Sequence, residues 1–177
     1  MRWGADPVLL TFLGALATGV LGACVAFVIR RFTGASTRWM IPFAAGAGML
    51  GFTIWTDYSW FDRQREGLPE DVVVVEAFEH SAALQPWTLI FPVVNRYSAL
   101  DRAGAERHPA RPELVRAPVF LAQRWQPSFV APQVIDCAEG RRADAASVGG
   151  DGLPPEDAWF DLPARHPLLE AACAIPD

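Results

Sequence analysis

Two uncharged apolar runs near the N-terminus constrain this chain more than any other feature. They cover residues 7–29 and 39–55, and only residues 30–38 separate them. A bilayer core about 30 Å thick needs about 20 apolar residues in a helix, because a helix satisfies its own backbone polar groups. The first run exceeds that length. The second has 17 residues but is bracketed by tryptophans, including Trp60, which favour the membrane interface. The two runs therefore predict a transmembrane helical hairpin.

The first run allows a second interpretation that involves Cys24. The sequence Leu21-Gly22-Ala23-Cys24 resembles the signal after which bacterial lipoproteins are cut and acylated on the cysteine. Residues 25–29 nevertheless continue the apolar run, which is longer than the 7 to 15 apolar residues usual in a signal peptide. We expect an uncleaved helix, and the sequence leaves lipidation of Cys24 open.

The distribution of arginine predicts an orientation in the membrane. Arg30, Arg31 and Arg38 lie in the short loop between the runs, and positive loops stay in the cytoplasm. All fifteen basic residues are arginine, which fits the compositional bias of a GC-rich bacterial genome and carries no functional message. The expectation is a multi-pass protein of a bacterial inner membrane with both termini in the periplasm, whose partners are the lipid bilayer and another membrane protein.

Small residues recur every fourth position in both runs. Such spacing lets helix backbones approach closely in lipid, where the hydrophobic effect does not drive helix association. The two helices pack on each other, or one of them packs on another membrane protein; the sequence leaves both open. The predicted helix-packing residues are Ala15, Gly19 and Ala23 in the first helix, with Ala44 and Gly48 in one register of the second and Ala47 and Gly51 in another.

The remainder of the 177 residues is sufficient for one small domain. We expect residues 1–60 to form the hairpin, with helices at about 7–29 and 39–56, and residues 61–177 to form a periplasmic domain. Runs of β-branched and aromatic residues predict an antiparallel sheet of about four strands. These expected strands are residues 71–80, 87–97, 114–125 and 129–137.

The segments between and after these strands have weaker signals. Residues 101–113 and 139–155 are polar and rich in glycine or proline, which favours loops. Residues 166–174 predict a short helix with Pro167 in its first turn. The expected fold class is thus a two-helix transmembrane hairpin followed by a small antiparallel β-rich extracytoplasmic domain with a short C-terminal helix.

Only two cysteines, Cys137 and Cys173, fall in the expected periplasmic domain. An oxidising compartment favours a disulfide between them, although two separate buried thiols also fit the sequence. The two residues are not spaced as a Cys-X-X-Cys redox or zinc motif.

Charge and motifs exclude several function classes. Residues 56–177 carry nineteen acidic residues and eleven arginines, which opposes nucleic-acid binding. There is no nucleophile elbow, phosphate loop or dinucleotide fingerprint. We therefore expect no catalytic residues and no cofactor. Glu76, Glu79 and His80 form the one compact group of acids and histidine and are weak candidates for a metal site; a solvated strand end is the ordinary explanation.

Arg124 and Trp125 precede a proline turn between the last two expected strands, so both side chains would be exposed. Tryptophan and arginine are enriched at protein interfaces. The sequence thus favours a non-enzymatic accessory or scaffold subunit whose periplasmic domain contacts a larger membrane protein complex. The alternative is a membrane-tethered periplasmic enzyme or metal-binding protein.

Overall fold

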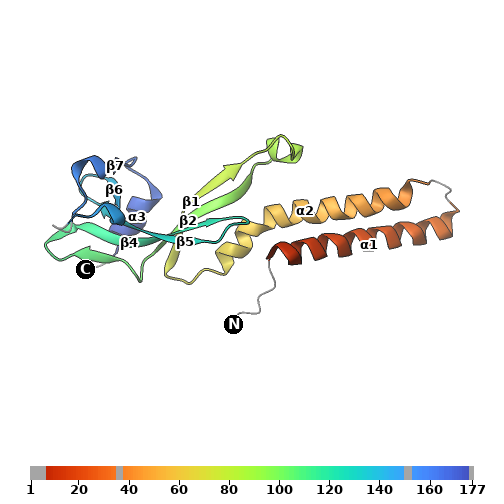
Figure 1. The fold of residues 1–177 in the computed structure, drawn as a ribbon, viewed down its shortest axis with the longest axis horizontal. Helices are drawn as coiled ribbons and strands as arrows, with labels where there is room; N and C mark the ends of the chain where they lie inside the picture. The colour runs from red at the N-terminus through yellow and green to blue at the C-terminus, as the bar shows by residue number, and fades with distance from the viewer. Residues whose placement is uncertain (1–6, 35–37, 150–152, 176–177) are drawn as a thin grey trace. The chain divides into compact units, whose positions relative to one another are not determined.

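A computed structural model describes residues 7–34, 38–149 and 153–175. The chain forms two compact units, Met1–Asp62 and Arg63–Asp177. The first is helical, and the second consists of a sheet with a short C-terminal helix (Figure 1).

The first unit contains two long helices, α1 (Pro7–Thr33) and α2 (Met40–Glu66). α1 ends at Gly34, whose φ of +68° is a left-handed conformation that glycine adopts without strain, and whose N–H donates to the carbonyl of Arg30 at 3.1 Å. α2 continues about ten residues beyond the end expected at 56, because the chain contains no helix breaker before Gly67 and Pro69.

One helix among the described residues, Val8–Thr33, is long and apolar enough to cross a membrane, judged by length and composition. Its large apolar side chains are exposed on every side except one. α2 is not apolar enough over the length of a membrane span, because its apolar part is short and rich in glycine.

Small residues bring the backbones of α1 and α2 into contact. A Cβ atom added at Gly22 would lie 2.4 Å from the carbonyl oxygen of Ala44, and one at Gly48 would lie 2.6 Å from that of Thr18. At Gly19 the nearest atoms belong to the flexible side chain of Met49, at 2.6 Å. The less exposed residues of α1 form a single face, which includes Ala15 and Ala23 as well as Gly19.

The second register of α2 lies away from α1. A Cβ atom at Gly51 would meet nothing within 4 Å, and Ala47 is exposed. Ala44 and Gly48, by contrast, are both partly buried. The two small-residue registers of α2 therefore differ: one packs against α1 and the other does not.

The second unit is a curled antiparallel sheet. Its strands are β1 (Val72–His80), β2 (Val93–Asp101), β3 (Glu106–His108), β4 (Arg111–Gln123), β5 (Phe129–Asp136), β6 (Arg141–Asp144) and β7 (Phe160–Asp161). They lie in the order β1-β2-β4-β5-β6-β7, and β3 pairs with β4. Short 3₁₀ helices occupy Pro86–Leu89, Ala145–Ser147 and Glu156–Ala158. The antiparallel sheet expected from the sequence is confirmed, with more strands than expected.

A short C-terminal helix, α3 (Pro167–Cys173), covers one face of this sheet and encloses the core. Leu100, Val115 and Ile135 are fully buried in that core. The Arg107 guanidinium donates to the carbonyls of Cys173 and Ile175, at 3.1 and 2.7 Å, and so satisfies the end of α3. The expected C-terminal helix is thus confirmed.

Three segments differ from their expected structure. Residues 86–89 form a 3₁₀ helix, and Pro92 immediately precedes β2, so the expected strand at 87–97 begins later. The expected loop at 101–113 contains β3 and the start of β4. The expected linker at 139–155 contains β6 and a 3₁₀ helix. These short polar strands depend on pairing with distant partners, which local composition does not encode.

Candidate functional site

The antiparallel order of the strands gives the sheet two chemically different ends. One end, which we call the turn end, contains the β1–β2 connection and the β4–β5 turn. It is where β1 and β4 end and where β2 and β5 begin. The opposite end, which we call the disulfide end, contains the end of β5 and β6. The candidate functional residues divide between these two ends.

Cys137 and Cys173 form a disulfide, with Cα atoms 5.8 Å apart and 36 residues apart in the chain. The bridge joins the residue that follows β5 to the last residue of α3. The third cysteine, Cys24, is free and exposed on α1. The bridge fixes α3 against the sheet at the disulfide end.

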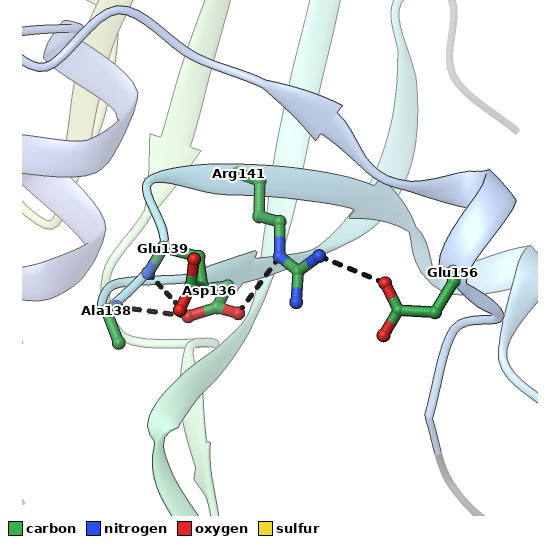
Figure 2. Close-up of polar contacts among 5 residues, drawn as sticks. All are labelled: Asp136, Ala138, Glu139, Arg141 and Glu156. Carbon is green, nitrogen blue, oxygen red and sulfur yellow. Dashed lines mark hydrogen bonds and ion pairs between the residues drawn. The ribbon is translucent and has the colours of Figure 1, made fainter.

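A buried carboxylate organises the turn that leads from β5 to β6 (Figure 2). Asp136 is 5% exposed and accepts from the backbone N–H groups of Ala138 and Glu139, at 3.0 and 3.1 Å. Arg141 donates to Asp136 at 3.3 Å and to Glu156 at 3.2 Å. Desolvation lowers the pKa of the Arg141 guanidinium, but these bonds and charges outweigh it, so the pKa lies above its usual value. The network is structural, since every member is bonded within the fold.

Replacing Asp136 with alanine is expected to destabilise the sheet unit by about 2 kcal/mol, because two backbone donors and a guanidinium lose their acceptor. Asp136→Asn retains an oxygen for the two N–H groups and loses the charge, so it should cost less. Urea unfolding of the full chain measures both. Equal stability of the alanine variant and the unchanged protein would contradict this assignment.

The β4–β5 turn presents an exposed tryptophan in an unusual backbone conformation. Trp125 is 55% exposed and has a φ of +66°, a left-handed conformation that costs most side chains about 1 kcal/mol. The Arg124 guanidinium stacks over its ring at 4.7 Å. Phe129 and Val130, at the start of β5, are also largely exposed. This turn therefore combines an arginine with several exposed apolar side chains.

The β1–β2 connection, residues 81–92, forms a second and larger apolar feature at the turn end. Leu84, Leu89, Ile90 and Phe91 are all exposed there. Our sequence interpretation missed this feature, because a strand was expected from 87 onward. A signal was nevertheless present: residues 81–95 contain no charged side chain.

The candidate metal residues lie on β1, and the structure pairs one of them with a residue from a distant segment. Glu76 lies 4.0 Å from His166 Nε2, while His166 Nδ1 accepts from the N–H of Leu168 and caps α3. These two side chains line a cleft of about 350 Å³ together with Phe78 and Arg142. Glu79 and His80 are exposed near the end of the strand.

Within residues 7–34, 38–149 and 153–175, no group of three or more His, Cys, Asp or Glu side chains is placed to hold a metal ion. The pair formed by Glu76 and His166 supplies two of the three or four protein ligands that a zinc site needs.

Comparisons with models of known protein families, with curated proteins and with solved structures find no match for this chain.

Proposed function

We propose that this protein is a non-enzymatic accessory or scaffold subunit of a bacterial inner membrane whose sheet unit contacts a larger membrane protein complex. In this proposal α1 and α2 form a two-helix transmembrane hairpin, and the chain is multi-pass with both termini in the periplasm. The loop that carries Arg30, Arg31 and Arg38 stays in the cytoplasm.

The close approach of the two helices supports the hairpin. α2 has only 16 uncharged residues before Thr56, so it is a marginal span by itself. Backbone contact at Gly22 and Gly48 gives it a partner inside the bilayer. Association with another helix is one way in which a bilayer accommodates a span that is shorter than its hydrocarbon core.

The proposal that the sheet unit contacts a protein rests on Trp125. An exposed tryptophan is a poor choice for a left-handed turn position, where glycine or asparagine would avoid the strain. Strain that a fold retains at an exposed residue points to a function at that residue. A rigid aromatic ring stacked on Arg124 is the combination that dominates binding energy at protein interfaces.

Trp125→Gly tests this function because it separates binding from folding. Glycine relieves the left-handed strain but raises the entropy of the unfolded chain by a comparable amount, so the variant should be about as stable as the unchanged protein. It should also lose the partner that the unchanged protein retains in a mild-detergent pull-down. The measurements are urea unfolding and mass spectrometry of the recovered proteins.

Phe160→Ala is the matched control for Trp125→Gly. Phe160 is also exposed and lies beneath an arginine, Arg142, but on β7 at the disulfide end. It should leave partner recovery unchanged. A Trp125→Gly protein that recovers the same partner in the same amount would refute an interface at this turn.

The cleft between Glu76 and His166 favours a second candidate function, a membrane-tethered periplasmic enzyme or metal-binding protein. A carboxylate and an imidazole on one cleft wall are common elements of both types of site. Stoichiometric metal in the purified protein that is lost in His166→Ala would favour this candidate over the first.

A further inference from the structure

The β1–β2 connection projects from the turn end as a short helical turn beyond the two paired strands (Figure 1). Leu84 at its tip is 95% exposed, and Ile90 is 73% exposed. The fold thus leaves large apolar side chains in contact with water in one small segment, which we call the apolar tip (residues 81–92).

The apolar tip is a defined structure that keeps these side chains outward. Thr88 is completely buried at its centre, where its hydroxyl accepts from the N–H of Ala82 at 2.9 Å and donates to the carbonyl of Gln85 at 2.7 Å. Pro86 begins the 3₁₀ helix, and Pro92 ends the segment. Because Thr88 occupies the interior position, Leu84, Leu89 and Ile90 lie on the outside. The exposure is therefore built into the turn.

We propose that the apolar tip inserts into the lipid of the membrane that holds α1. This inference rests on the membrane anchoring in the proposed function and adds a second contact with the bilayer. Residues 81–95 carry no charge, so the tip can enter the boundary between headgroups and acyl chains without desolvating an ion. The β4–β5 turn combines tryptophan with arginine, two residue types enriched at protein interfaces, whereas the tip contains no arginine.

Charges at the base of the tip limit its depth of insertion. Glu79 and His80 are exposed at the end of β1, and Arg96 on β2 stacks over Phe78 at 4.4 Å. These groups favour water or headgroups over hydrocarbon. Insertion is thus restricted to the residues beyond His80.

Chain length permits the tip to reach the membrane surface. α2 continues from Trp55 to Glu66, about 16 Å of helix beyond its apolar part. β1 has nine residues and spans about 30 Å. A strand of that length is sufficient to return to the level at which the apolar part of α2 ends. Tethering by α1 also keeps lipid at a high effective concentration around the tip.

Lipid quenching of a fluorescent probe in the full chain tests the insertion. Leu84→Cys in a Cys24→Ala background provides one reactive thiol, because Cys137 and Cys173 are bonded. The protein is labelled with an environment-sensitive dye and reconstituted in phosphatidylcholine nanodiscs with or without doxyl-labelled lipid. We expect the probe at position 84 to be quenched by doxyl lipid to an extent comparable with a probe on the native Cys24 of α1.

Ala146→Cys, exposed on the 3₁₀ helix after β6, is the matched control and should not be quenched. Quenching at Cys24 but not at position 84 overturns the inference and leaves the proposed anchoring intact. A probe at 84 that is shielded from aqueous iodide and unquenched by doxyl lipid means that protein covers the tip, which also overturns it. No quenching at Cys24 overturns both the anchoring and the insertion.

Discussion

Replacing both Cys137 and Cys173 with alanine is expected to destabilise the sheet unit by about 4 kcal/mol. The bridge closes a loop of 36 residues, and the chain-entropy model assigns that magnitude to a loop of this length. The bridge also holds α3, which supplies Leu168, Leu169 and Ala172 to the core.

Urea unfolding of the full chain in mild detergent, monitored by near-ultraviolet circular dichroism, measures this loss of stability. The control is Cys24→Ala, which removes the free thiol of α1 and should leave the midpoint unchanged. Thiol titration of the unfolded, unreduced protein should find one free group. Three free groups, or equal midpoints for the double variant and the control, would rule out a stabilising bridge.

The sequence was sufficient to predict those elements whose signals are local. Four successive valines predicted β1, and proline followed by apolar residues at helical spacing predicted α3. The pair of cysteines was predictable for another reason, since only two remained outside the apolar runs. In each case the residues that form the element also carry its signal.

Elements that depend on distant partners were not predictable in the same way. β3 consists of Glu106, Arg107 and His108, and β6 begins with two arginines, so neither resembles a strand. Both become strands because a neighbouring strand offers a free edge for hydrogen bonds. Local propensity contributes little to such pairing.

The candidate site was only partly visible for a similar reason. The sequence singled out Arg124 and Trp125 as exposed because a proline turn follows them; Trp125 is exposed, whereas Arg124 is half-buried. The left-handed backbone of Trp125 is a property of the folded turn. The β-propensity of residues 87–97 hid the apolar tip. The exposure of Leu89 and Ile90 depends on the interior position of Thr88, which the sequence does not show. The absence of charged residues from 81–95 was the signal in the sequence, because a strand in a small exposed sheet usually carries some charged side chains.

The largest effect expected in the helical unit is that of Gly48→Leu. A Cβ atom at this position would lie 2.6 Å from the carbonyl oxygen of Thr18 and 3.6 Å from the Cα atom of Gly19. Both atoms belong to the backbone of α1, which cannot move aside as a side chain can. We expect the variant to weaken the association of α1 and α2 by about 3 kcal/mol or more.

Gly46→Leu is the matched control, because it makes the same change two residues away on α2, where an added Cβ meets nothing within 4 Å. Spin labels on the exposed positions Leu16 and Leu50, in a Cys24→Ala background, report the separation of the helices by double electron–electron resonance. The unchanged protein and Gly46→Leu should give one narrow distance distribution, and Gly48→Leu a broad, longer one. If Gly48→Leu retained the narrow distribution, the glycine would not be needed for the contact between α1 and α2.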